Sequence, residues 1–323
     1  MYNRPDEIDE LLASFLTLDF EGDYEIVIVE DGSNESSETV VNKYQHKLPI
    51  TYFFKPNSGP GASRNYGMEK AKGNYFIILD SDCMLPSHYL NTVASYLSNS
   101  SIDCYGGADA AHPTFSPLQK AISYVMTSFL TTGGIRGSEK SVNTFEPRSF
   151  NMGISKDAFE KTKGFAKIHP GEDPDLSQRI IKAGFQTAYI PNAFVYHKRR
   201  ISWSKFYTQV KKFGLVRPIL TKWHPTTAKI TFWLPSLFVL FSLCSIIGTV
   251  LLHWVVGLPL LGYILLLLID SSVRNKSIYI GILSMIAVFV QFFGYGLAFL
   301  KSTFLVRILN KDEQKQFPKL FFK

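Results

Sequence analysis

Cysteine is scarce in this chain of 323 residues. It occurs at Cys83, Cys104 and Cys244, a spacing that matches neither a disulfide framework nor a cysteine-based metal motif. The sequence is therefore typical of a reducing compartment. A P-loop and a dinucleotide-binding fingerprint are also missing, because the glycine-rich stretch at residues 56–67 has neither the lysine nor the glycine spacings that those sites require.

Acidic residues are almost absent from the second part of the chain. Residues 1–195 contain 17 Lys and Arg against 24 Asp and Glu, a net charge of −7. Residues 196–323 contain 17 basic and 3 acidic residues, a net charge of +14. A chain of this length can form more than one domain. The sequence thus predicts an acidic folded domain joined to a basic, apolar region.

Two long apolar runs, residues 231–269 and 277–300, contain no Asp, Glu, Lys or Arg at all. One membrane crossing takes about 20 helical residues, so the first run is long enough for two crossings and the second for a third. Trp254, Gly257 and Pro259 indicate a turn within the first run. We expect about three transmembrane helices within residues 231–306, rather than helices buried in a soluble core.

A basic flank precedes these runs. Residues 196–230 contain nine Lys and Arg and no acid. Positive flanks mark the cytoplasmic side of an inner or plasma membrane, so the acidic domain is expected to face the cytoplasm. Aromatic side chains lie between the basic ones, and residues 201–230 are expected to form an amphipathic interfacial segment on an anionic membrane surface. Nucleic acid is not an expected partner, because it would not account for the adjacent apolar runs.

The basic tail, residues 307–323, conflicts with three full crossings. Three crossings would place this tail outside the cell, against the same charge rule. Either the third segment does not fully cross, or residues 231–269 divide differently. The sequence leaves both possibilities open.

Residues 1–200 alternate between strand-like and helix-like composition. Strands are expected at 24–29, 50–54 and 75–79, and helices at 5–16, 36–44 and 61–72. This alternation predicts an α/β domain with a mostly parallel sheet and flanking helices. Ligands bind beyond the carboxyl ends of the strands in open sheets of this kind.

Carboxylates follow two of the expected strands. Glu30 and Asp31 end the first, and Asp80 and Asp82 follow the buried strand in the sequence FIILDSD. A polar strand end can simply be a turn, but two acidic ends on one sheet favour a binding site. Between them, Gly59 and Gly61 would let backbone amides approach a ligand closely.

Six short motifs occur in a specific order: YNRP at 2–5, EDGS at 30–33, NSGPGASRNYG at 57–67, DSD at 80–82, NMG at 151–153 and GED at 171–173. In this order they resemble the family-2 glycosyltransferases, membrane-associated enzymes of the GT-A fold that use nucleotide sugars. The resemblance covers roughly the first 215 residues. It implies a Rossmann-like GT-A domain in residues 1–200, followed by the C-terminal transmembrane helices.

The resemblance implies a nucleotide-sugar site and a metal site. The expected nucleotide-sugar residues are Asp31, Ser33, Asn57, Arg64, Asp80, Asn151 and Gly153, with Asp31 near the base and Arg64 near the phosphates. The expected metal residues are Asp82, Asp80 and His197. A divalent cation neutralises the leaving diphosphate, and hard Mg²⁺ or Mn²⁺ prefers rigidly held carboxylate oxygens. His197 is equally well explained as the start of the basic interface.

Asp173 is the candidate general base, which takes the proton from the acceptor hydroxyl as it attacks the anomeric carbon. Residues 171–184 fit a helix that begins near Pro174, so Glu172 and Asp173 would lie at its N-terminus. An acid that caps a helix is the alternative. Glu172 would orient the acceptor or support the helix end.

Two departures from the family pattern matter. The family begins with a hydrophobic strand before YNRP, but here Met1 directly precedes Tyr2, so we expect a late-placed start or a truncated chain. A native N-terminal peptide that begins at Met1 would refute this. Residues 209–213, QVKKF, only resemble the Gln-x-x-Arg-Trp of cellulose and hyaluronan synthases. Lys lacks the bidentate contacts of Arg and Phe lacks the indole donor.

The expected function is an inverting, metal-dependent transfer of one sugar to a lipid-linked or membrane-proximal glycan acceptor, with the active site in the cytoplasm. Inversion follows from the resemblance, and a UDP-sugar is the default donor. One alternative is a processive polysaccharide synthase, which product length would distinguish. Another is a non-catalytic membrane anchor that binds nucleotide sugars, against which intact Asp80, Asp82 and Asp173 argue.

Overall fold

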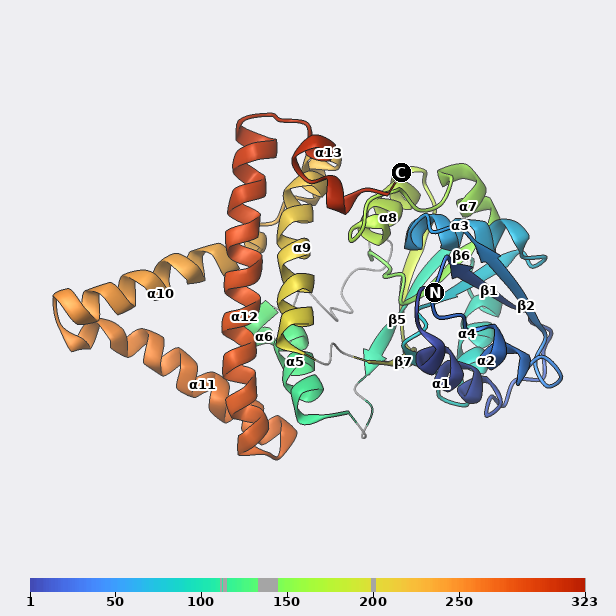
Figure 1. Cartoon of the computed structure of the whole chain (residues 1–323), viewed down its shortest axis with the longest axis horizontal. Helices are drawn as coiled ribbons and strands as arrows, with labels where there is room; N and C mark the ends of the chain where they lie inside the picture. Colours follow the sequence, from blue (N-terminus) through green and yellow to red (C-terminus); the bar gives the residue numbers. More distant parts are fainter. Residues whose placement is uncertain (111, 113–114, 133–144, 199–201, 323) are drawn as a thin grey trace. The chain divides into compact units, whose positions relative to one another are not determined.

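The computed structural model describes residues 1–110, 112, 115–132, 145–198 and 202–322 (Figure 1). Its contacts divide the chain into two compact units. The first, here the α/β unit, comprises Met1–His112, Glu139–Lys198 and Phe321–Lys323. The second, here the helical unit, comprises Pro113–Ser138 and Arg199–Leu320.

The α/β unit contains two sheets. Strands β1 (Ile26–Asp31) and β2 (Ile50–Lys55) form a parallel pair. The second sheet has the order β3 (Tyr75–Leu79), β6 (Asn151–Ser155), β5 (Cys104–Ala110), β7 (Thr187–His197) and β4 (Cys83–Met84). In that sheet β5 and β7 are parallel, and the other neighbours are antiparallel. The larger sheet is therefore mixed.

Helices flank the sheets, as the alternation predicts. They are α1 (Pro5–Phe15), α2 (Glu38–Asn42), α3 (Pro60–Lys70), α4 (Tyr89–Ser98), α7 (Lys156–Thr162) and α8 (Glu172–Lys182). A proline occupies the first turn of both α1 and α3, where its missing N–H costs nothing. The expected strands all form, within two residues of their predicted bounds. Helix α2 is shorter than expected.

The strands β1 and β3 belong to separate sheets among the described residues. On the free side of β1, the Met1 amino group donates to Val29 O at 2.6 Å. The Asp31 amide donates to Met1 O at 2.8 Å. Met1 thus bonds to two residues of β1 that lie two positions apart, which is the pattern of parallel strand pairing. The expectation of a strand upstream of Met1 stays a prediction.

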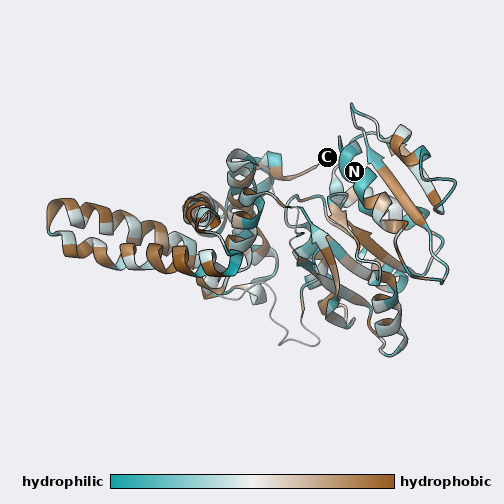
Figure 2. Ribbon diagram, turned by 90° about the horizontal axis from the view of Figure 1, so that it is seen from below, coloured by the Kyte–Doolittle hydropathy of each residue, from teal (hydrophilic) through white to brown (hydrophobic). Residues whose placement is uncertain are grey.

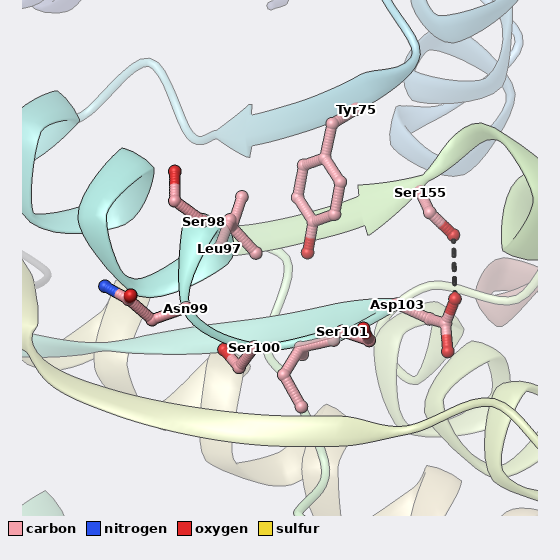
Figure 3. Close-up of a pocket in the computed structure, with 9 residues that line it drawn as sticks. Tyr75, Leu97, Ser98, Asn99, Ser100, Ser101, Asp103 and Ser155 are labelled. Atoms are coloured by element: carbon pink, nitrogen blue, oxygen red, sulfur yellow. Dashed lines mark hydrogen bonds between the residues drawn. The ribbon is translucent and has the colours of Figure 1, made fainter.

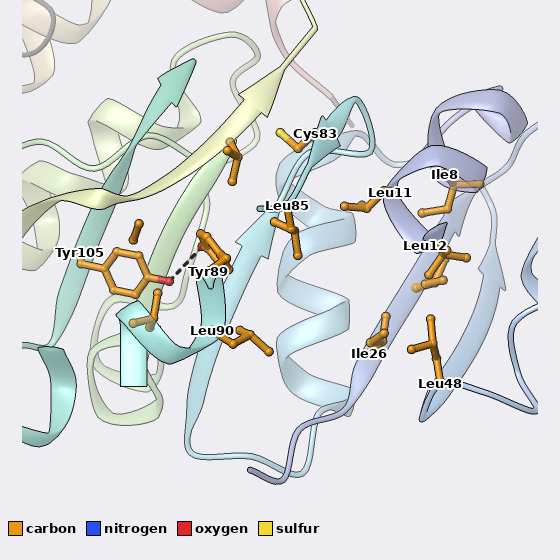
Figure 4. Packing of buried hydrophobic residues seen from close by; sticks show 14 of the residues in the cluster. Ile8, Leu11, Leu12, Ile26, Leu48, Cys83, Leu85, Tyr89, Leu90 and Tyr105 are labelled. Carbon is orange, nitrogen blue, oxygen red and sulfur yellow. Dashed lines mark hydrogen bonds between the residues drawn. The ribbon is translucent and has the colours of Figure 1, made fainter. Parts of the chain in front are cut away.

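Two hydrophobic clusters hold the α/β unit together. The first cluster packs Ile8 and Leu12 of α1, Ile26 of β1 and Tyr89 of α4 together (Figure 4). It also includes Tyr105, whose hydroxyl lies 3.2 Å from that of Tyr89. The second packs α8 against β6 through Leu176, Ile180, Met152 and Ile154, all fully buried. A fully buried side chain of this size contributes about 1.5–3 kcal/mol. The second cluster thereby fixes the direction of α8.

The helical unit contains α5 (Pro117–Thr127), α6 (Phe129–Thr132), α9 (Trp203–Trp223), α10 (Leu234–Leu251), α11 (Leu258–Asn275), α12 (Ile278–Ser302), a π-helical turn at Thr303–Ile308 and α13 (Glu313–Gln316). Three stretches are long and apolar enough to cross a membrane: Ile230–Leu251, Trp254–Asn275 and Ile278–Ile308. Figure 2 shows how apolar these helices are. Helices α10 and α11 each pack on α12 but barely touch each other (Figure 1).

Helix α9 corresponds to the expected interfacial segment. It buries Phe206, Val210 and Gly214 and packs along α12. Gly214 permits this close approach, because a Cβ there would overlap the backbone carbonyl of Tyr295. Binding of this segment to an anionic membrane surface stays a prediction.

Candidate functional site

Strand β3 delivers Asp80 and Asp82 to the edge of its sheet. Phe76 and Ile78 bury the strand on one face. Beyond Leu79 the chain turns tightly, because the Cys83 amide donates to Asp80 O at 3.1 Å. The two carboxylates are thus held close together by a buried strand and a short turn.

Arg64 joins the end of β3 to the start of α8. Its guanidinium donates to Asp80 Oδ1 at 2.7 Å and to Glu172 Oε1 at 3.0 Å. Burial alone would lower the pKa of Arg64, but the charges of Asp80 and Glu172 outweigh burial and raise it. Arg64 therefore stays charged between two acids that lie 92 residues apart in the chain.

Asp82 lies against His197. The register of β4 and β7 pairs Cys83 with His197, which brings the imidazole Nε2 to 3.3 Å from Asp82 Oδ1. The ring of Phe150 stacks on the imidazole of His197, with the two ring centroids 4.9 Å apart, and so fixes the orientation of the imidazole. Arg4 Nη1 lies 3.5 Å from Asp82 Oδ2.

These donors fit a divalent cation. The ligand atoms of Asp82, Cys83 and His197 lie within 4.8 Å of one another. The carboxylate suits Mn²⁺ or Mg²⁺, and the imidazole suits a transition metal better than Mg²⁺, so the pair favours Mn²⁺. Burial raises the pKa of the Cys83 thiol, which keeps it protonated and makes it a poor ligand. Asp80 is held by Arg64 and is not part of this group. In the described part of the chain, His197 Nδ1 is buried without a hydrogen bond, and Asp109 Oδ2 lies 4.0 Å from it.

Asp173 lies in the first turn of α8. Its nearest cation is Arg148, with Nη1 3.7 Å from Asp173 Oδ2. Burial raises the pKa of Asp173 above its ordinary value, Arg148 opposes this shift, and the charge of Glu172 adds to it. A carboxylate with a raised pKa is a stronger base than an exposed one.

Glu172 is almost completely buried beside Asp173. His169 Nδ1 lies 2.9 Å from Glu172 Oε1. Burial alone would raise the pKa of Glu172, but the hydrogen bond and charge of His169 and the charge of Arg64 lower it to about 2. Glu172 is therefore an anion that links Arg64 and His169, while its neighbour Asp173 holds its proton more tightly.

Asp31 closes the loop that follows β2. Its carboxylate accepts the amides of Ser58 and Gly59, each at 2.9 Å, and pairs with Lys55. Asn57 Nδ2 donates to Asp31 O at 2.8 Å. Asp31 is only 4% exposed, so its carboxylate organises this loop. Its contact with a base stays a prediction.

Ser33 and Asn57 remain near the surface of this region. Ser33 Oγ accepts the amide of Asn3 at 2.8 Å, which ties the YNRP segment to the EDGS turn. Asn57 is exposed. Both lie beside Asp31, and their contact with a nucleotide sugar stays a prediction.

Asn151 and Gly153 lie on β6, inside the larger sheet. Asn151 is fully buried, accepts from the Tyr89 hydroxyl at 2.6 Å, and donates to Ala193 O and Ala108 O. A Cβ on Gly153 would overlap the ring of Tyr105. Both residues contact protein in this structure, and their contact with a nucleotide sugar stays a prediction.

The loop glycines also differ from expectation. A Cβ on Gly61 would lie 2.7 Å from Ala166 O, and one on Gly59 would overlap the ring of Phe322. The Gly59 amide is used by Asp31. Sequence reasoning expected these two glycines to make room for a ligand. In the structure they make room for other parts of the protein, Phe322 and Ala166.

Sequence reasoning missed three basic residues of this site, Arg4, Arg148 and His169. Arg4 belongs to YNRP, and His169 precedes Glu172 by three residues, so both carried a local signal. Arg148 carried none, because its partner is 25 residues away.

A separate pocket of about 490 Å³ lies at the start of β3 (Figure 3). It is lined by Tyr75, Leu97, Asp103, Ser155 and the serines and asparagine between Leu97 and Ile102. Tyr75 begins β3 and Asp80 follows its end, so this pocket is apart from the acidic site.

Comparison with known proteins bears on this geometry. A family model described as "Glycosyl transferase family 2" matches residues 1–162. The chain belongs to glycosyl transferase family 2. The likeness of the chain to solved structures of glycosyltransferases gives it the GT-A fold.

Curated relatives share the first part of the chain. An uncharacterized glycosyltransferase of Rickettsia typhi is 34% identical over 111 residues, which cover 33% of this chain and 34% of that protein. Poly(ribitol-phosphate) beta-N-acetylglucosaminyltransferase TarS of Staphylococcus aureus is 31% identical over 99 residues, 30% of this chain and 17% of TarS. Minor teichoic acid biosynthesis protein GgaB of Bacillus subtilis is 26% identical over 205 residues, 62% of this chain and 22% of GgaB. The matched segments span about a third or less of these relatives.

Two solved structures share the fold over most of the chain. Mannosyltransferase PcManGT of Pyrobaculum calidifontis, in complex with GDP-Man and Mn²⁺, has a TM-score of 0.57 at 14% identity, covering 92% of this chain and 85% of PcManGT. A fragment of S. aureus TarS in complex with UDP-GlcNAc has a TM-score of 0.50 at 17% identity, covering 93% and 89%.

Proposed function

We propose that this glycosyltransferase uses a divalent cation to transfer one sugar, with inversion, from a nucleotide-diphosphate sugar to a lipid-linked or membrane-proximal acceptor in cell-surface glycan synthesis. The active site is formed by Asp80, Asp82, Asp173 and Arg64 and faces the cytoplasm. The proposal rests above all on Arg64, whose contacts with Asp80 and Glu172 unite the end of β3 with the start of α8.

In this proposal, residues at the ends of β1 and β3 bind the sugar donor. Asp82 and His197 would hold Mn²⁺ or Mg²⁺, which when bound neutralises the leaving diphosphate. Arg64 orients Asp80 and adds positive charge beside the phosphates. A UDP-sugar is the proposed donor, supported by the UDP-GlcNAc complex of TarS. The PcManGT complex with GDP-Man and Mn²⁺ makes a GDP-sugar the first alternative to test.

Residues at the N-terminus of α8 act on the acceptor. Asp173 would take the proton of the acceptor hydroxyl as that oxygen attacks the anomeric carbon. Glu172 stays ionised and holds Arg64 and His169 in place. The relatives TarS and GgaB, named for poly(ribitol-phosphate) and teichoic acid synthesis, support a cell-surface glycan as the product. The three apolar helices support an acceptor at the membrane.

Membranes that contain the full chain test the donor and metal. They are incubated with labelled UDP-GlcNAc, UDP-glucose or GDP-mannose, in Mn²⁺, in Mg²⁺ or in EDTA, and label is measured in the lipid extract. We expect label from one donor, with a requirement for the cation and a product longer by one sugar. Full transfer in EDTA would contradict the metal, and long products would favour the processive alternative.

The variant Asp173→Asn tests the general base. We expect kcat to fall by a factor of about 10² to 10⁴, because the amide cannot accept the proton, while the donor KM changes little. Glu160→Gln, an exposed acid on α7, is the matched control and should leave kcat unchanged. Transfer that survives Asp173→Asn would assign the base elsewhere.

A further inference from the structure

Phe321 and Phe322 belong to the α/β unit, although they follow the three apolar helices in sequence. The residues just before them, Pro318–Leu320, are assigned to the helical unit. Phe321 forms an antiparallel bridge with Ile168. The Phe322 amide donates to Lys167 O at 2.9 Å. The segment is thus attached along its backbone to the stretch that leads into α8.

The ring of Phe322 lies on the Gly59 turn. A Cβ on Gly59 would overlap that ring, so the ring fills the space that a side chain would occupy. Gly59 has φ = +92°, which glycine adopts freely, and its amide donates to Asp31 Oδ2. Phe322 therefore covers the turn that holds the Asp31 carboxylate.

Phe322 also reaches the acceptor side. Its ring centroid lies 6.3 Å from that of His169, and His169 is hydrogen-bonded to Glu172. One aromatic side chain therefore contacts the loop below Asp31 on one side and the partner of Glu172 on the other. A tether for the end of the chain would need the backbone contacts but not this particular position.

We propose that Phe322 is a positioning residue for glycosyl transfer. Its ring holds the Gly59 turn against the His169–Glu172 pair, and so fixes the spacing between the donor loop and the N-terminus of α8. This role rests on the proposed function, because it assumes that the Gly59 turn lies on the donor side. The backbone attachment through Phe321 brings the ring to this place, and the ring itself sets the spacing.

The kinetic test uses the full chain with Phe322→Ala and Phe322→Tyr. The alanine variant keeps the backbone contacts of residues 321 and 322 but removes the ring, so the donor loop gains freedom. We expect the donor KM to rise about tenfold while kcat changes less than KM. Phe322→Tyr keeps the ring and should restore the donor KM. Phe54→Ala, an aromatic of β2 that is 57% exposed, is the matched control and should change neither constant.

Hydrogen exchange of the backbone amides gives a second readout that needs no activity. In Phe322→Ala the peptide covering residues 56–67 should exchange faster than in the wild type, whereas the peptide covering β3 should not. Unchanged exchange at residues 56–67 would overturn the proposal, as would a loss of kcat at constant KM that Phe322→Tyr does not restore. If the wild type transfers no sugar from any donor, the proposed function fails, and the exchange result still decides whether the ring holds the turn.

Discussion

At the scale of single residues, Asp173 and Glu172 show how position divides two neighbouring carboxylates. Glu172 faces Arg64 and His169, and its pKa lies at about 2. Asp173 is half-buried, its main cation is Arg148 at 3.7 Å, and this partial burial keeps its pKa above the ordinary value. The first acid is a permanent anion, and the second can exchange a proton.

The protonation state of Asp173 should determine how the rate of sugar transfer depends on pH. A base must be deprotonated, so kcat/KM should fall as the pH drops through the raised pKa of Asp173. Arg148 lowers that pKa, so Arg148→Met should move the acidic limb of the kcat/KM profile to higher pH. Lys156→Met, which removes an exposed positive charge from α7, serves as the control. An acidic limb that stays in place in Arg148→Met would show that another group is titrated.

Single residues were predictable where a local pattern marks them. Asp80, Asp82 and Asp173 stand at strand or helix ends, and the sequence shows such ends directly. Asn151 stands in a similar polar motif, but its partners Tyr89 and Ala193 are distant in the chain. The sequence does not reveal which polar group finds a partner inside the protein, and therefore did not reveal that Asn151 is buried and hydrogen-bonded.

At the scale of elements, β6 determines how closely the larger sheet packs. Gly153 pairs with Tyr105 on one neighbour and Ile77 on the other. The Tyr105 ring fills the space beside Gly153 and stacks on the ring of Tyr75, with the ring centroids 6.2 Å apart. Neighbouring strands can bring this ring against the backbone only because position 153 has no side chain.

Gly153→Ala should therefore destabilise the protein. The added methyl group overlaps a fully buried ring that has little room to move, and overpacking of this kind costs about 1–3 kcal/mol. The melting temperature of the purified protein in detergent measures the effect. Gly73→Ala is the control, because its Cβ would meet no atom nearer than 3.9 Å. Equal melting temperatures for the two variants would contradict this account of the packing.

The elements that sequence predicts well are those with uniform apolar composition. β3, YFIIL, lies at its expected position, and the apolar helices match their charge-free runs. β5, CYGGADA, and β6, NMGIS, carry glycines that weaken the signal for a strand. Their antiparallel pairing depends on distant partners, so the sequence predicted a mostly parallel sheet where the structure has a mixed one.

At the scale of the whole molecule, Phe321 and Phe322 constrain the membrane topology. They contact Ile168 and Lys167, so the end of the chain is attached to the α/β unit. Residues 309–320 are too polar to cross a bilayer. We therefore propose that the number of crossings is even and that two of the three apolar stretches cross.

The third stretch, Ile278–Ile308, is the one best suited to remain at the interface. Protein covers 44% of its apolar window, against 28% and 17% for the first two. Helix α12 packs along α9, whose basic residues suit a membrane surface. Hydropathy shows which helices are apolar enough to cross, but burial against a neighbour decides which of them meet lipid.

Cysteine labelling tests this topology. Lys319→Cys and Glu160→Cys are made separately in a Cys244→Ser background, since Cys83 and Cys104 are buried. In intact cells neither should react with a membrane-impermeant maleimide, and both should react after permeabilisation. The background protein without either new cysteine is the control. Labelling of Lys319→Cys alone in intact cells would place the tail outside and restore three crossings.

The proposed pair of crossings would have a consequence for the fate of the product. Two helices of one chain cannot enclose an aqueous conduit, so a sugar added to the proposed lipid acceptor at the inner leaflet would stay there with that lipid. Exposure of the glycan on the cell exterior would then require a second protein that flips or exports it.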